Sequence, residues 1–148
     1  MREYRHLQVW QKAHRLTLEV YRVTRSLPRS ELYGLTSQLR RAAVSVPANI
    51  AEGCGRGGDV EFLRFLRIAS GSASELEYLL VLTADLHLID AQASEQLVAA
   101  IAEVKRMLAG LMTTLTARTP PRRGGSGSVR EGAAYLESDS GDDRIDDR

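Results

Sequence analysis

Polar side chains recur along one side of the segment that surrounds Pro47. At about 100° per residue they fall within an arc of about 80° if this segment is an α-helix. The set comprises an amide, a cation, a hydroxyl, a second amide and an anion. When such groups are partly buried, they can serve as hydrogen-bond donors and acceptors for one another. The members of this polar line are Gln38, Arg41, Ser45, Asn49 and Glu52. We expect Glu75, which follows a run of small residues in the next segment, to form an ion pair with Arg41.

These residues could form a catalytic site, but the sequence favours a structural role. Covalent catalysis needs a nucleophile, a base and a third group that orients the base, and no such set is present. The spacing of the histidines to carboxylates and to the single cysteine does not match that of metal-binding motifs. They are His6, His14 and His87. We therefore predict a polar network that fixes the register between helices, in a protein that is not an enzyme and has no catalytic residues, metal or cofactor.

A second set of charged residues lies on the first periodic segment. Six cations share an arc of about 160° if this helix is regular to its ends. They are Arg5, Lys12, Arg15, Arg22, Arg25 and Arg29, which we call the basic stripe. Such a row can bind phosphates without reading bases. An ordinary solvated helix face would look the same, and the sequence leaves both interpretations open.

Two aromatic residues project from another flank of the same predicted helix. Trp10 and Tyr21, with Thr17 between them, would lie outside the core of a single bundle. Aromatic residues are enriched at the centres of protein interfaces. They could instead cover a crevice at a helix end, but we favour an oligomer interface.

Four helical segments must position these residues. Apolar residues recur every three or four positions in four stretches, with no sustained two-residue alternation. The predicted helices run from about His6 to Leu27, from between Ser30 and Ser37 to the glycines at 53–58, from Asp59 to about Leu88, and from Asp90 onward. Asp59 and Asp90 are the expected N-caps. Such lengths with short connections predict an all-α, antiparallel up-down four-helix bundle. Pro47 should kink the second helix and free the Ala43 carbonyl.

The charge is unevenly distributed, although the 148-residue chain has a formal net charge of only +1. Residues 1–67 hold 12 Lys/Arg against 6 Asp/Glu, whereas residues 68–118 hold 3 against 6 and the last 30 hold 5 against 7. An anionic partner would therefore bind the first half. Residues 119–148 are rich in Gly, Ser, Pro and Asp, so we predict a disordered acidic tail after a bundle domain at residues 1–118.

The cellular compartment is predicted from the cysteine content and from the lengths of the apolar stretches. One cysteine, Cys54, excludes an intrachain disulfide and fits a reducing compartment. The first residues lack the apolar stretch of a signal peptide, and the longest apolar run is too short to span a bilayer. We expect a soluble, cytoplasmic protein without a membrane partner.

Several separated motifs carry a resemblance to a known family. They are the start Leu7, Val9, Trp10 and Ala13, the stretch "YGLTSQLRRAAVSVPANIAEGCGR", and "EFLRFLRIASGSASELE" after it. Over residues 4–118 the chain resembles the bacterial four-helix-bundle proteins encoded by intervening sequences in 23S rRNA genes. The resemblance implies a non-enzymatic bundle that assembles as a homopentameric ring. A more distant relative is the accessory variability protein of diversity-generating retroelements, a basic pentamer that works with a reverse transcriptase and nucleic acid.

Two hypotheses about function follow. In the first, the protein is a non-catalytic oligomer that binds RNA or another nucleic acid through its basic first half, in association with the ribosome or a reverse transcriptase. In the second, it is a ring-shaped protein-interaction scaffold with no role in nucleic-acid binding. The salt dependence of binding to heparin or RNA separates the two.

Overall fold

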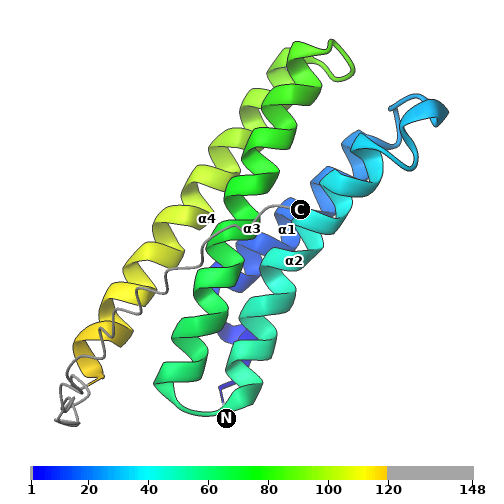
Figure 1. The fold of residues 1–148 in the computed structure, drawn as a ribbon. Helices are drawn as coiled ribbons and strands as arrows, with labels where there is room; N and C mark the ends of the chain where they lie inside the picture. The colour runs from blue at the N-terminus through cyan, green and yellow to red at the C-terminus, as the bar shows by residue number, and fades with distance from the viewer. Residues whose placement is uncertain (1, 120–148) are drawn as a thin grey trace, which may run out of the picture.

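The structure, a computed structural model, describes residues 2–119 and consists of four helices in that range (Figure 1). The helices are α1 (Gln8–Thr24), α2 (Leu35–Arg56), α3 (Asp59–Asp85) and α4 (Ala91–Arg118), with 3₁₀ turns η1 (Tyr4–His6) and η2 (Arg29–Glu31). No strand occurs between residues 2 and 119, so the predicted all-α four-helix architecture is confirmed. The predicted acidic tail lies, from residue 120 onward, outside the described residues.

Helices that are consecutive in the chain lie side by side, and α1 also packs against α4, which closes the bundle. Figure 1 shows the N-terminus at the end where α2 turns into α3, and the other two connections at the opposite end. Val9, Ala13, Leu16 and Val20, which recur every three or four positions along α1, are buried, and Val20 is fully enclosed. In the other helices, Leu39, Leu66, Leu76 and Ile101 are likewise inaccessible. No helix between residues 2 and 119 is both long and apolar enough to cross a membrane.

The first helix is shorter than the sequence predicts. It begins at Gln8 and ends at Thr24, whereas the apolar pattern suggested His6 to Leu27. The residues after Thr24 turn with hydrogen bonds of the 3₁₀ type, since the Leu27 amide donates to the Thr24 carbonyl at 3.3 Å. Pro28 cannot continue the helix. Residues before Gln8 and after Thr24 therefore do not follow the wheel of α1, which matters for the basic stripe.

The glycines between α2 and α3 do not all lie outside a helix. α2 continues through Gly53 and Gly55 and ends at Arg56, and the next residue, Gly57, has a φ of 73° that suits glycine. Gly53 is buried, and a Cβ there would lie 2.8 Å from the Phe65 Cβ. Its missing side chain therefore allows α2 and α3 to approach closely.

The two predicted N-caps have different outcomes. The Asp90 carboxylate accepts a hydrogen bond from the Ala93 amide at 3.1 Å, which confirms it as the N-cap of α4. Asp59 is instead the first residue of α3, after Gly58 in the cap position. Its carboxylate forms an ion pair with Arg2. The α3 N-cap prediction was therefore wrong, because Gly58 adopts a φ of 78° that fixes the chain entry instead.

Candidate nucleic-acid interface

The proline in α2 leaves a backbone carbonyl of that helix without its usual hydrogen-bond donor, and a side chain of α1 supplies a donor in its place. Pro47 has no amide hydrogen, so the Ala43 carbonyl lacks its partner one turn later. The Thr17 hydroxyl lies 2.9 Å from this carbonyl oxygen and also 2.9 Å from that of Ala13 in its own helix. Thr17 is buried, and its single hydroxyl proton can serve either acceptor. The sequence placed Thr17 on an outer flank, whereas the structure places it at the contact between α1 and α2.

Part of the polar line forms a small network between α2 and α3. The hydroxyls of Ser45 and Ser72 lie 2.7 Å apart, and the Asn49 amide donates to the Ser45 carbonyl at 2.8 Å and to its hydroxyl at 3.0 Å. Both Ser45 and Asn49 are partly buried. These contacts tie the middle of α2 to the small-residue stretch of α3. Ser72 was not singled out from the sequence, although its position within that stretch is the signal.

The remaining members of the polar line do not join this network. Glu52 forms an ion pair with Arg56 one turn later, at 2.5 Å. Arg41 and Glu75 are exposed, and in the part of the chain that the structure describes they form no ion pair. The predicted ion pair between Arg41 and Glu75 is therefore wrong. At this level of α2 and α3 both side chains border open space.

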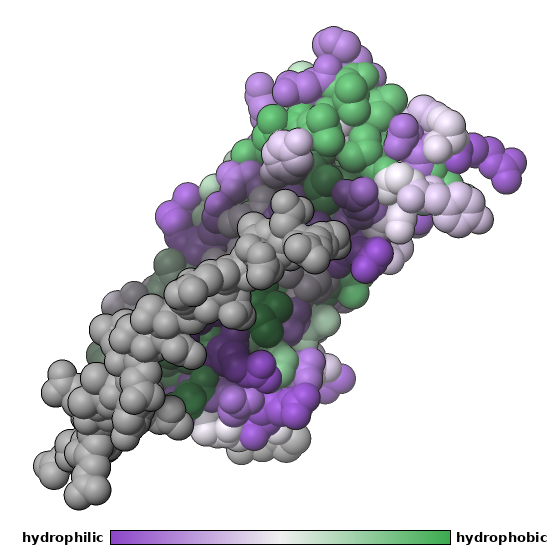
Figure 2. All heavy atoms as spheres, in the orientation of Figure 1, coloured by the Kyte–Doolittle hydropathy of each residue, from purple (hydrophilic) through white to green (hydrophobic). Residues whose placement is uncertain are grey.

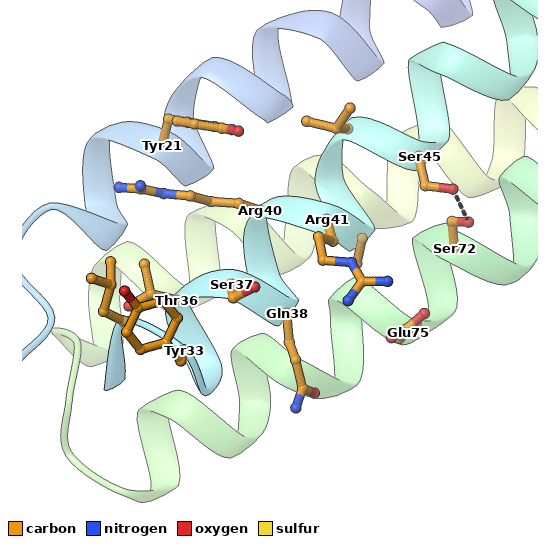
Figure 3. A pocket seen from close by; sticks show the side chains of 13 residues that line it. Tyr21, Tyr33, Thr36, Ser37, Gln38, Arg40, Arg41, Ser45, Ser72 and Glu75 are labelled. Carbon is orange, nitrogen blue, oxygen red and sulfur yellow. Dashed lines mark hydrogen bonds between the residues drawn. The ribbon is translucent and has the colours of Figure 1, made fainter. Parts of the chain in front are cut away.

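That open space is a groove of about 1060 Å³ between the first half of α2 and α3 (Figure 3). Gln38, Arg41 and Ser45 line it from α2, and Ser72 and Glu75 line it from α3. Exposed aromatic and aliphatic residues also line it. They are Tyr21, Leu32, Tyr33 and Val44, and Tyr33 is 94% exposed. The groove therefore offers hydrogen-bonding groups, cations and a solvent-facing aromatic ring on one surface.

The basic stripe is divided in the structure, because only three of its members lie on α1. Lys12 crosses to α4 and forms an ion pair with Glu103 at 2.6 Å, and Arg22 pairs with Glu19 at 2.8 Å. With Arg15, these residues border a groove between α1 and α4 of about 360 Å³. The carboxylates of Glu19 and Glu103 offset part of the positive charge here.

The stripe residues beyond α1 lie in two other places. Arg5 is on η1, near Glu3 at 3.7 Å. Arg25 follows the last residue of α1, and Arg29 begins η2. These two arginines border a separate cavity of about 290 Å³ at the corner where α1 leads into α2. The assumption of one regular helix face fails because the chain leaves α-helical geometry at both ends of α1.

A third arginine lines this corner, and the sequence interpretation did not include it. The Arg40 guanidinium lies 4.7 Å from the centre of the Tyr21 ring (Figure 3). Its Nε donates to the Thr24 hydroxyl at 2.9 Å. Thr36, Arg40, Ala43 and Pro47 recur at steps of four, three and four, which is the signal that Arg40 faces α1. Between residues 2 and 119, none of Arg25, Arg29 and Arg40 forms an ion pair.

The two candidate interface aromatics differ in burial. Trp10 is partly buried against the core, stacked on His14 with ring centres 5.0 Å apart and in edge contact with Tyr4. It therefore belongs largely to the fold of its own chain, unlike the outward projection that the helix wheel suggested. Tyr21 remains 40% exposed and borders the groove between α2 and α3.

Titratable groups in residues 2–119 are not arranged for metal binding, since no cluster of three His, Cys, Asp or Glu side chains is present there. Burial raises the pKa of the Cys54 thiol, which favours the neutral, unreactive form. The hydrogen bond from Lys12 lowers the pKa of Glu103, and the positive charges of Arg106 and Arg15 add to this effect.

Comparison with known proteins gives a family and a fold. The family described as 23S rRNA-intervening sequence protein matches residues 5–110. A solved structure described as a protein with unknown function from the S23 ribosomal protein family of Bacteroides thetaiotaomicron VPI-5482 is 23% identical. It aligns with a TM-score of 0.66 over 70% of this chain and 97% of that one. No protein with a curated description matches. The match over residues 5–110, on the four-helix fold described above, shows that the chain belongs to the 23S rRNA-intervening sequence protein family.

Proposed function

We propose that this protein is a non-catalytic, self-associating bundle that binds RNA through the cations around α1 and the start of α2. The observation that carries the proposal is the cluster of Arg25, Arg29 and Arg40, which share one cavity without a carboxylate on its lining. Guanidinium groups with free donors bind phosphate through charge-assisted hydrogen bonds. The family name, which refers to 23S rRNA, is consistent with an RNA partner.

Exposed apolar side chains support self-association. Figure 2 shows apolar residues gathered at the end of the bundle where α3 leads into α4. Tyr78, Val81 and Leu86, near that end of α3, are each more than two-fifths exposed. Exposed apolar patches mark interaction sites, and the resemblance to ring-forming relatives makes a homopentamer the assembly that we propose. Light scattering should give five times the chain mass, and a mass of 16.3 kDa at micromolar concentration would contradict self-association.

The RNA-binding proposal is tested by fluorescence anisotropy at low salt. Two labelled single-stranded RNAs of equal length and unrelated sequence should bind with similar affinity, because phosphate contacts carry no sequence information. The protein is used with residues 119–148 in place. Failure of both RNAs to bind at roughly 50 mM salt, where phosphate contacts are strong, would reject the proposal.

A protein-interaction scaffold is the alternative, and one observation favours it. Leu32, Tyr33 and Val44 expose apolar surface in the groove between α2 and α3, as a protein-binding groove would. A scaffold without an RNA role would show no binding in the anisotropy experiment, and its retention on heparin would not depend on salt. These two readouts separate the alternatives without knowledge of the partner.

A further inference from the structure

The corner cavity and the groove are neighbours with different chemistry. Leu32, Thr36 and Arg40 line both, so the two spaces adjoin along α2. The corner supplies three cations beside an apolar floor that includes Leu27 and Pro28. The groove supplies aromatic rings, an amide and hydroxyls beside a single carboxylate on its lining, Glu75. A ligand that extends from one space into the other would need an anionic part followed by a part that can stack and form hydrogen bonds.

The arginines of the corner are available for a ligand. Arg40 is held by Thr24 and Tyr21 through its Nε and its planar face, which leaves its terminal nitrogens as donors. Arg25 and Arg29 are exposed. The acidic residue closest to them in sequence, Glu31, uses its carboxylate to accept from the Leu35 amide at 3.2 Å, at the start of α2. The corner is thus partly pre-organised and keeps its positive charge.

Tyr33 is the second part of the argument. It lies in the turn between η2 and α2, borders the groove, and leaves 94% of its surface in water. Figure 3 shows it next to Thr36, at the end of the groove nearest the corner. A ring that is so exposed contributes little to its own fold. It can offer a face to an unstacked base, and stacking of this kind tolerates any base.

From this arrangement we infer that the protein holds single-stranded RNA at one defined place, with a backbone phosphate at the corner of Arg25, Arg29 and Arg40 and an adjoining base stacked on Tyr33. The inference rests on the proposed RNA binding and gives that binding a location and a strand type. A duplex could place a phosphate at the corner, but it could not stack a base on Tyr33, because its bases are already stacked on one another. The remaining polar groups that line the groove, Gln38 and Ser37 among them, can form hydrogen bonds with the edges of that base.

The phosphate part is tested with the double variant Arg25→Gln/Arg29→Gln, which spares Arg40 because that residue has structural contacts. Its matched control is Arg67→Gln/Arg106→Gln, which removes the same charge from exposed positions on α3 and α4. We expect the corner variant to bind a single-stranded RNA about tenfold more weakly, as loss of a charge-assisted contact implies. The control should stay within about twofold of the wild type, since it removes only distant, screened charges. Equal losses in the two variants would overturn the inference.

The stacking part is tested with Tyr33→Ala against Leu18→Ala, which removes an exposed apolar side chain from α1 that lines neither the groove nor the corner. We expect Tyr33→Ala to weaken single-stranded RNA binding about tenfold, and Tyr33→Phe to keep the wild-type affinity. Binding of an abasic strand or of duplex RNA should be the same in the wild type and Tyr33→Ala. A loss that is equal for abasic and normal strands would overturn the stacking role.

Three outcomes separate this inference from the proposed function. If the wild type binds no RNA at low salt, the proposed function fails and the inference fails with it. If the wild type binds but the corner and Tyr33 variants match their controls, only the inference fails. If Tyr33→Ala lowers the oligomer mass in light scattering and leaves RNA affinity intact, the groove is a protein interface, and that result also overturns the inference.

Discussion

The Thr17 hydroxyl of α1 lies 2.9 Å from the Ala43 carbonyl oxygen of α2, the acceptor that Pro47 deprives of its helical partner. A proline within a helix normally costs about 3 kcal/mol, partly through the lost backbone hydrogen bond. Here the neighbouring helix replaces that bond with a side-chain donor. The contact also fixes where α1 meets α2, because a buried carbonyl without a donor is costly.

Removal of the Thr17 hydroxyl should therefore destabilise the protein. We expect Thr17→Val to lower the free energy of unfolding by about 1–3 kcal/mol, because the Ala43 carbonyl becomes buried without a partner. Urea denaturation measures the change. The control is Thr113→Val on α4, whose hydroxyl makes the same contact one turn back, to Ala109, on the exposed surface. That change should stay within about 0.5 kcal/mol.

A double-mutant cycle with Pro47→Ala isolates the relationship. Alanine at position 47 restores an amide that can donate to the Ala43 carbonyl, so the Thr17 hydroxyl becomes less necessary. We expect Thr17→Val to cost at least about 1 kcal/mol less in the Pro47→Ala background than in the wild type. Equal costs in both backgrounds would show that the hydroxyl acts through Ala13 alone.

Gly53 provides a test of the contact between α2 and α3. Alanine there would place its Cβ 2.8 Å from the Phe65 Cβ and 2.9 Å from a ring carbon of Phe62, so the two helices would have to separate. We expect Gly53→Ala to destabilise the fold by about 1–3 kcal/mol. Gly71→Ala is the matched control, since no atom lies within 4 Å of its added Cβ. It should stabilise α3 by about 0.5–1 kcal/mol, and a destabilising Gly71→Ala would contradict the geometry.

The ion pair between α1 and α4 predicts a measurable titration. Lys12 lowers the pKa of Glu103 chiefly through its hydrogen bond, so the folded protein favours the ionised carboxylate. The stabilisation is therefore present above the ordinary glutamate pKa and is lost as the pH falls through the lowered value. Carbon NMR of the Glu103 carboxyl should show a midpoint below the ordinary one, and Lys12→Gln should raise it. The control Arg22→Gln should leave the midpoint unchanged. An unchanged midpoint in Lys12→Gln would contradict the ion pair between Lys12 and Glu103.

Much of the fold was predictable because it depends on local periodicity. Val9, Ala13 and Val20 mark the buried face of α1 by spacing alone, and Asp90 marks the start of α4 by its cap chemistry. The exact ends of α1 were not predictable. They depend on where 3₁₀ hydrogen bonds replace α-helical ones, a difference that Leu27 and its apolar pattern do not encode.

The candidate site was less predictable, because its side chains come from different helices. A helix wheel shows that Lys12 points outward, but not that Glu103 of α4 lies across from it. The same limit produced the incorrect Arg41–Glu75 pair, since complementary charge does not guarantee proximity. The position of Arg40 on the face of α2 that contacts α1 could have been predicted from its spacing to Pro47. The position of Tyr33 beside the corner depends on the conformation of the turn between η2 and α2, which the sequence pattern does not reveal.

Removal of charge from α1 tests how much of the basic stripe contributes to RNA binding. Arg15→Glu/Arg22→Glu should weaken binding, because both side chains are exposed and lie off the buried face. Helix content by circular dichroism and oligomer mass should not change. Because Glu19 and Glu103 already offset charge on this side, we expect a smaller loss than at the corner. A larger loss here than in Arg25→Gln/Arg29→Gln, after correction for the greater charge change, would place the main contact on α1.

The salt dependence of RNA affinity tests the central claim most directly, because it counts phosphate contacts without assuming which residues make them. For single strands, the slope of log affinity against log salt is about −0.7 for each phosphate that the protein neutralises. One phosphate held at the corner therefore predicts a linear decrease with a slope of about −0.7, and phosphate contacts from the cations of α1 make the slope steeper. A slope near zero for an RNA that binds, or no binding at low salt, would contradict RNA recognition through these cations.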